Sequence, residues 1–190
     1  PLHAMFAGMR LLLALICLFQ AAPASADVAV WFRDGNPLDR FWIENRGCKT
    51  IVGVVDIDLR NTAGRVIIDT AYGGIGTKDP MPVEIEAGNI ALDPVADGAQ
   101  DLTVYLKSLG PKETAIVTLD LDDTKSRWFT PRVEVDGWEV AGGLVTFQTP
   151  LGSAFATFSE TGQAVIPNPS AMDCSAPKKV APVIDEELIS

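Results

Sequence analysis

Hydrophobic and polar residues alternate along short stretches of this chain, and turn-forming residues separate the stretches. The clearest cases are residues 50–60 and 115–122, where apolar and polar positions alternate with a period of two, as in half-buried β-strands. Between residues 133–135 and 138–140, the Asp136-Gly137 pair is a strong short signal for a β-hairpin. The pattern therefore predicts a chain built from short strands.

About nine to eleven such segments follow one another at a spacing of roughly 8–12 residues, with almost no helical periodicity. Further strands are expected at residues 28–32, 41–44, 66–69, 82–86, 102–106, 144–147, 154–158 and 164–166. Residues 50–60 and 66–69 are expected to pair as a hairpin, and the Gly-rich stretch 72–80 to be a flexible connection. This spacing predicts an all-β fold, an antiparallel β-sandwich of immunoglobulin-like or jelly-roll-like type, with a barrel as the alternative.

The first 26 residues have the features of a cleaved signal peptide. Arg10 precedes the apolar run 11–19, and a small-residue segment ends at Ala26, where cleavage is expected. The apolar run is too short for a permanent membrane anchor, which needs about 20 residues. We therefore expect an exported protein, periplasmic or extracellular, with one domain over residues 27–174 and a loose tail over 175–190.

Charge and composition narrow the possible functions. Without residues 1–26 the chain has 14 basic and 25 acidic residues, a net charge of −11, and no histidine. The absence of histidine excludes Ser-His-Asp and Cys-His catalysis and any metal site built on imidazole. Because nucleic acid and anionic membranes repel such an acidic protein, we expect neither as a partner. No Gly-x-Ser-x-Gly motif is present either, and we expect a protein without catalytic activity.

Two cysteines, Cys48 and Cys174, remain after removal of the leader. In an exported chain, a lone pair of cysteines usually forms a disulfide. A Cys48–Cys174 bridge would join an early strand to the end of the domain. Closing such a long loop is worth about 4–5 kcal/mol in the chain-entropy model, less any strain.

Acidic residues supply the first candidate binding site. Asp56 and Asp58 share one face of a predicted strand, as do Asp120 and Asp122, and Asp123 follows directly. Calcium binds six to eight oxygens, and Asp-rich loops at the end of a sandwich can supply them. The alternative is that these aspartates form the solvated faces of half-buried strands. Calcium is the only cofactor that this pattern suggests.

Tryptophan supplies the second candidate site, because exposed indole rings can stack on sugars. The four tryptophans are Trp31, Trp42, Trp128 and Trp138. Core packing is expected for most of them, with at least one in the core. Trp128 follows a polar stretch, and it is the residue that we expect to be exposed and to bind a ligand.

Short motifs spread over residues 27–148 add a resemblance to a known family. They are Asp39-Arg40-Phe41, Glu44-Asn45 with Cys48, Asp56-Ile57-Asp58-Leu59, Gly64 with Ile68-Asp69, Asp120-Leu121-Asp122-Asp123-Thr124 and Val140-Ala141-Gly142. In these motifs the chain resembles small exported bacterial proteins that are similar to the sponge aggregation factor core protein. The family name implies calcium-dependent cell adhesion, and the resemblance assigns no role to individual residues.

These observations together predict an exported adhesion or aggregation module without catalytic activity, stabilised by calcium. Its partner would be an extracellular protein or glycan. The alternative is a carbohydrate-binding module that uses exposed tryptophans. Paired tryptophans on one exposed sheet face would favour the carbohydrate-binding alternative, and clustered aspartate oxygens would favour the adhesion module.

Overall fold

Twelve β-strands make up the part of the chain that the structure, a computed structural model, describes: residues 27–35, 38–76, 80–125 and 135–169. No helix with the length and apolar character needed to cross a membrane occurs in these ranges. The strands are β1 (Asp27–Arg33), β2 (Asp39–Asn45), β3 (Ile51–Asp58), β4 (Ile67–Ile68), β5 (Glu84–Ala87), β6 (Asn89–Leu92), β7 (Asp101–Leu109), β8 (Thr114–Leu119), β9 (Leu121–Asp122), β10 (Leu144–Thr149), β11 (Gly152–Thr157) and β12 (Gln163–Pro167).

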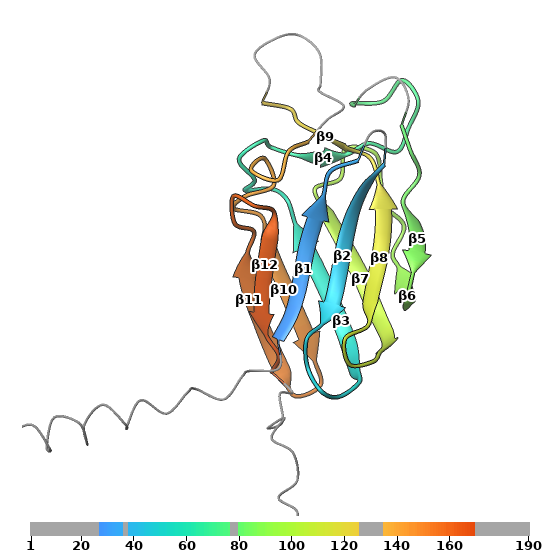
Figure 1. Ribbon diagram of the computed structural model, residues 1–190. Helices are drawn as coiled ribbons and strands as arrows, with labels where there is room; N and C mark the ends of the chain where they lie inside the picture. Colours follow the sequence, from blue (N-terminus) through green and yellow to red (C-terminus); the bar gives the residue numbers. More distant parts are fainter. Residues whose placement is uncertain (1–26, 36–37, 77–79, 126–134, 170–190) are drawn as a thin grey trace, which may run out of the picture.

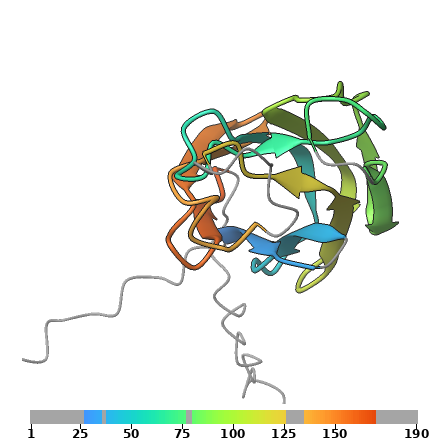
Figure 2. The same ribbon diagram turned by 90° about the horizontal axis from the view of Figure 1, so that it is seen from above.

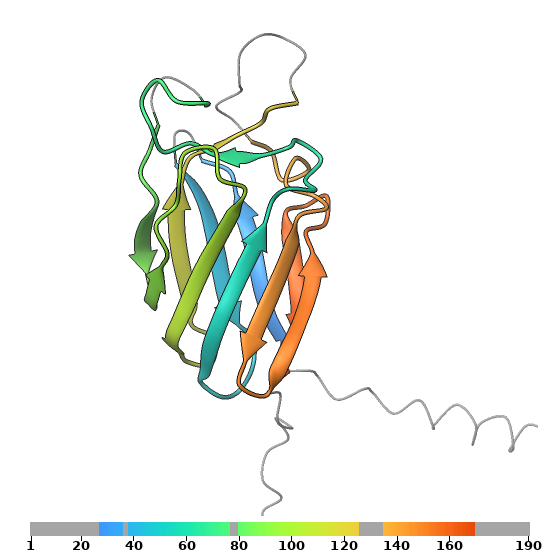
Figure 3. The same cartoon turned by 180° about the vertical axis from the view of Figure 1, so that it is seen from behind.

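Two five-stranded antiparallel sheets pack face to face. Sheet A has the order β12-β1-β2-β8-β5, and sheet B has the order β11-β10-β3-β7-β6 (Figures 1 and 3). A small sheet of β4 and β9 lies at one end of the sandwich, which we call the loop end, and Figure 2 looks down on it. The predicted antiparallel β-sandwich is confirmed.

The core lies between the inner faces of the two sheets. Phe41 on β2 is completely buried, and its ring centroid lies 5.8 Å from that of Phe32 and 5.8 Å from that of Phe158. Val55 and Phe147 of sheet B belong to the same buried cluster. Because side chains alternate along a strand, these apolar residues fill the interior while their neighbours in sequence face outward.

The expected hairpin of residues 50–60 and 66–69 is wrong. β3 pairs with β7 and β10, whereas β4 pairs with β9. The Thr62 hydroxyl donates to the Leu59 carbonyl at 2.8 Å and accepts from the Val66 backbone N–H at 2.9 Å. These bonds close a local turn after β3, and β4 then lies at the loop end instead of folding back along β3.

Two further local predictions fail. Residues 138–140 form a turn instead of a strand, with the Glu139 N–H donating to the Asp136 carbonyl at 2.9 Å. Most of the expected partner strand, residues 133–134, lies outside the described residues. The sequence, with Pro94 and Gly98, suggests a loop over residues 90–100, but residues 90–92 belong to the edge strand β6.

Gly88 lets consecutive strands enter different sheets. It separates β5, the edge of sheet A, from β6, the edge of sheet B. Its φ is +99°, and an added Cβ would lie 2.7 Å from the Cβ of Ala115. Only glycine can adopt this positive φ and also fit against Ala115 without strain. Gly88 therefore connects the two sheets at one side of the sandwich.

Asn45 ties the two sheets together at the end opposite the loop end. Its side-chain amide donates to the carbonyls of Lys49, Leu109 and Gly110 at 2.7, 2.9 and 3.0 Å. Its side-chain oxygen accepts from the Gly47 N–H at 2.9 Å. Because Asn45 ends β2 in sheet A and Leu109 ends β7 in sheet B, one completely buried amide joins both layers.

Replacing Asn45 with alanine is expected to lower the free energy of unfolding by about 2–3 kcal/mol, because buried backbone groups lose their partners. Urea-induced unfolding, followed by tryptophan fluorescence, measures this change. Asn89→Ala is the control, since Asn89 is exposed on β6 and should change stability by less than about 0.5 kcal/mol. Equal effects of the two substitutions would contradict the role given to Asn45.

Candidate functional site

The structure divides the predicted acidic residues into three groups, of which the first lies on β3. Asp56 and Asp58 lie on the outer face of β3, and both have donors there. Asp56 accepts from the Thr103 hydroxyl at 2.8 Å and from the Gln148 amide at 2.7 Å. Asp58 forms an ion pair with Arg60, whose hydrogen bond holds the pKa of Asp58 below its usual value. For these two residues the geometry agrees with the solvated-face alternative.

The second group lies at the loop end and is buried. Asp39, Asp69, Asp120 and Asp122, which we call the acidic cluster, each have at most 1% of their surface exposed. Asp39 begins β2, and Asp69 follows β4. Asp120 lies between β8 and β9, and Asp122 ends β9. For Asp120 and Asp122 the solvated-face alternative is wrong. The chain leaves sheet A after Leu119, and β9 pairs with β4 in the small sheet instead of continuing an exposed strand.

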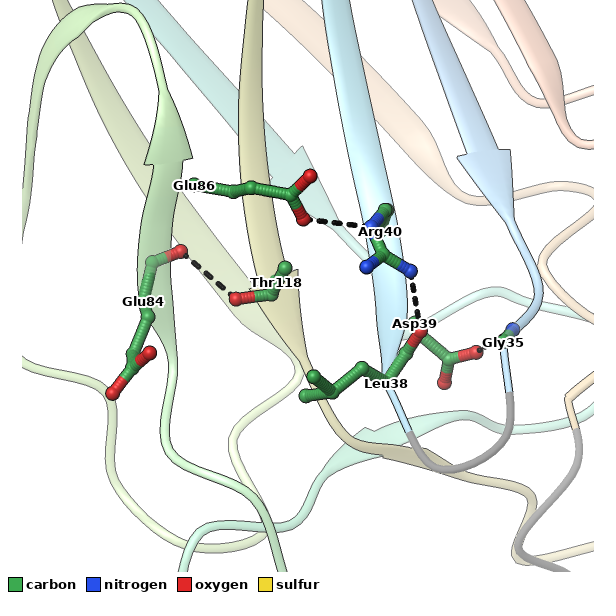
Figure 4. A network of polar contacts seen from close by, with 7 residues as sticks. All are labelled: Gly35, Leu38, Asp39, Arg40, Glu84, Glu86 and Thr118. Atoms are coloured by element: carbon green, nitrogen blue, oxygen red, sulfur yellow. Dashed lines mark hydrogen bonds and ion pairs between the residues drawn. The ribbon is translucent and has the colours of Figure 1, made fainter.

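Asp39 faces inward from the start of β2. Its carboxylate oxygens accept from the N–H groups of Gly35 at 3.2 Å and Leu121 at 3.1 Å. Burial raises its pKa to about 8 against the effect of these bonds, and the charges of Asp34 and Asp120 add to the rise. Arg40, the next residue, projects to the other side of the strand and pairs with Glu86 at 2.7 Å (Figure 4).

Asp120 is the least satisfied member of the acidic cluster. Neither of its carboxylate oxygens, both inaccessible to solvent, accepts a hydrogen bond of normal geometry from the described residues. Burial, and then the charge of Asp69, raise its pKa to about 6, while the backbone N–H of Met81 lowers it less. No basic side chain is among the groups that shift this pKa.

Gly76 brings Asp69 and Asp122 together. A Cβ on Gly76 would lie 2.2 Å from an oxygen of Asp122 and 2.3 Å from an oxygen of Asp69. The two carboxylate oxygens are therefore within about 4.5 Å of each other, the sum of these distances. A side chain at position 76 would displace one or both carboxylates, so the close approach depends on glycine.

Asp97 fixes the Gly-rich segment that carries Gly76. It accepts from the N–H groups of Thr70 and Ile75, both at 3.1 Å. These bonds hold the pKa of Asp97 below its usual value, and the bond from Thr70 has the largest effect. The stretch 72–80 was expected to be a flexible connection, yet its first part is held between Thr70 and Ile75 by one carboxylate.

Asp123 belongs to a separate carboxyl pair. It is 2% exposed and interacts with Glu139, whose pKa is raised by burial and by the proximity of Asp123. Glu139 also accepts from the Asp136 N–H at 2.8 Å. The predicted set of five aspartates is thus divided among three places.

Two tryptophans lie side by side on the outer face of sheet A. Trp31 and Trp42 are direct partners in the pairing of β1 with β2, and both are half-buried. The guanidinium of Arg46 lies 4.9 Å from the ring centroid of Trp31, and that of Arg33 lies 4.6 Å from that of Trp42. Trp138 is 52% exposed, so none of the three described tryptophans is in the core. Trp128, the predicted ligand-binding residue, lies outside the described residues.

Sequence reasoning missed Asp39, Asp69 and Asp97. A usable signal existed for Asp69, which stands just before the glycine-rich segment at the end of an apolar run. Nothing local identifies Asp39 or Asp97, because the pairing of distant strands brings them to the loop end.

Over the described ranges, no three acidic, cysteine or histidine side chains form a ready-made metal-binding group. Comparisons of the chain with protein-family models, with curated proteins and with solved structures give no match. What the chain does must therefore be inferred from its own residues.

In a buffer with a chelator, the free energy of unfolding is expected to fall as the pH rises from about 4 to about 8. The pKa of Asp120 rises from 3.8 to about 6 on folding, and that of Asp39 rises from 3.8 to about 8. Between these limits the folded state binds more protons than the unfolded state. Each such group lowers stability by up to about 1.4 kcal/mol per pH unit, which urea unfolding at several pH values measures.

Asp120→Asn should reduce the fall of the free energy of unfolding between pH 4 and pH 8. It should also stabilise the protein at pH 8, because the amide carries no charge into the interior. Asp58→Asn is the matched control. Since Arg60 lowers the pKa of Asp58, that residue stays ionised above pH 5 and its loss should leave the slope unchanged. Stability that is constant or rises from pH 5 to pH 8 would contradict the burial of unneutralised carboxylates.

Proposed function

We propose that this protein is an exported adhesion or aggregation module without catalytic activity, which binds an extracellular protein or glycan through its loop end. The observation that carries the proposal is the exposure of large apolar side chains there. Tyr72 is 83% exposed and Ile75 is 64% exposed, both in the segment after β4. Trp138, in the turn that contacts Gly64 just before β4, is 52% exposed.

A rigid scaffold with functional loops suits such a role. Loops on a sandwich can carry recognition residues while the sheets hold them in place. Large apolar side chains lose little by being covered by a partner, and clusters of them commonly mark interaction sites. The calcium-dependent adhesion implied by the resemblance is consistent with a binding surface above the acidic cluster.

Carbohydrate binding through tryptophan is the second candidate, and the pairing of Trp31 with Trp42 favours it. Two neighbouring indole rings on one sheet face form the kind of platform on which sugars stack. The guanidinium groups of Arg33 and Arg46 each cover one of these rings, which reduces the area open to a sugar. For this reason the loop end is the preferred surface.

Purified protein coupled to fluorescent beads is expected to make the beads clump. Tyr72→Ser combined with Ile75→Ser, and separately Trp138→Ser, should reduce clumping several-fold. Val52→Ser and Phe155→Ser are matched controls, because these side chains are 57% and 69% exposed on β3 and β11, away from the loop end.

A glycan array tests the alternative with the same variants. Glycan binding that is lost in Trp31→Ala and kept in the loop-end variants would identify the outer face of sheet A, and not the loop end, as the binding surface. Wild-type protein that neither clumps beads nor binds any glycan would refute an adhesion role.

The Cys48–Cys174 disulfide stays a prediction, and Cys174 lies outside the described residues. Strand register supports it. Pro167 pairs with Asp27 in β1, whose partner β2 ends at Asn45, so β12 ends about two strand spacings, or about 10 Å, from the loop that carries Cys48. The seven residues from Pro167 to Cys174 can span up to about 23 Å.

Intact-mass measurement of the exported protein is expected to show a chain lighter by two hydrogen atoms than after reduction. Peptide mapping should recover Cys48 and Cys174 in one cross-linked fragment. Labelling of Cys48 by a thiol reagent without prior reduction would contradict this pairing.

A further inference from the structure

We propose that the outer face of sheet B binds a neutral carbohydrate, which stacks on the ring of Phe155 and forms hydrogen bonds with Asp56 and Gln148. We call these residues, together with Thr103 and Thr146, the sheet B surface. It is separate from the loop end and from the tryptophan pair on sheet A. The inference therefore goes beyond the proposed adhesion role and does not depend on it.

Strand register places the residues of the sheet B surface in one row. Phe155 on β11 pairs directly with Thr146 on β10. Thr146 pairs with Asp56 on β3, and Asp56 pairs with Thr103 on β7. Directly paired residues share a face, so the row crosses four strands and is about 14 Å long, at about 4.8 Å between neighbouring strands (Figure 3). The only register shift between β3 and β7 lies at the start of β3, so the sheet is regular along this row.

An exposed aromatic ring lies at each side of this surface. Phe155 is 69% exposed, while its neighbours Ala154 and Ala156 pack against the core. Tyr105 on β7 is 38% exposed, and its hydroxyl donates to Asp93 at 2.8 Å, which fixes the ring. The face of an aromatic ring carries partial negative charge and attracts the C–H groups of a sugar ring. Two such rings on opposite sides suit a short oligosaccharide better than a single sugar.

Hydrogen-bonding groups occupy the space between the two rings. Asp56 accepts from the Thr103 hydroxyl at 2.8 Å and from the Gln148 amide at 2.7 Å, so its carboxylate is already oriented. Each carboxylate oxygen has room for a further bond, and the exposed Gln148 amide offers both a donor and an acceptor. These groups match the hydroxyls of a sugar, and their fixed positions reduce the entropy that binding costs.

Charge on this face selects a neutral ligand. Asp56 lies at its centre, Asp93 lies beside Tyr105, and Asp58 pairs directly with Asp101 on the same face. These carboxylates would repel an acidic glycan, whereas a neutral sugar supplies the O–H donors that carboxylates accept. The centre of a typical protein–protein interface is apolar and poor in charge, and a central aspartate does not fit that description.

Isothermal titration of the wild-type protein is the direct test. The probes are neutral hexasaccharides of glucose, mannose and N-acetylglucosamine, with polygalacturonate as the acidic probe. We expect heat of binding with a neutral probe and none with polygalacturonate. Phe155→Ser and Phe155→Leu should each weaken binding about tenfold or more, because both remove the ring, whereas Phe155→Tyr should keep it.

Asp56→Asn and Gln148→Ala should weaken binding several-fold. Asp58→Asn is the matched control for Asp56, because it lies on the same face of β3 and is paired with Arg60. Val165→Ser is the control for Phe155, since Val165 is 38% exposed on β12, an edge strand of sheet A. Both controls should bind the sugar as the wild type does.

The absence of binding to every neutral probe at millimolar concentration would overturn the proposal. Binding that is kept in Phe155→Ser and lost in Trp31→Ala would place the sugar on sheet A and also overturn it. Full binding in Phe155→Leu would exclude stacking, and loss of bead clumping in Phe155→Ser without sugar binding would make this face a protein contact. Clumping that depends on Tyr72 and Ile75, without sugar binding, would refute this inference and leave the adhesion role intact.

Discussion

The burial of four carboxyl groups at one end of the sandwich is the constraint on which the local structure depends. Asp39, Asp69, Asp120 and Asp122 come from three separate parts of the chain, and strand pairing brings them together away from water. Charges of one sign repel strongly in such surroundings. Burial raises the pKa of Asp39 and of Asp120, so the stability of this end depends on pH.

The two ends of the sandwich are held by different chemistry. At one end the neutral amide of Asn45 satisfies three backbone carbonyls from both sheets, and that junction needs no ion. At the loop end the hydrogen bonds of Asp97 order a backbone segment against the buried carboxyl groups of Asp69 and Asp122. The exposed side chains of Tyr72 and Ile75 therefore lie in a segment that is packed against buried carboxyl groups.

The fold was largely predictable from the sequence, because alternation along residues such as 50–60 and 115–119 reports directly which side of a strand is buried. The site was only partly predictable. Asp120 and Asp122 were recognised as a pair, but the alternation that identified them also suggested exposure. That rule fails where β8 ends and β9 pairs with β4, since both residues of this short strand are buried at the loop end.

The sequence by itself determined the strand periodicity, the acidity, the absence of histidine from the predicted domain and hence the classes of chemistry that this domain cannot perform. Only the tertiary structure decided which aspartates meet. Asp56 and Asp58 found donors on an open sheet face, whereas Asp69, Asp120 and Asp122 were enclosed together. The physical reason is that periodicity is a local property of the backbone, while the burial of a charge depends on segments that pair across long stretches of chain.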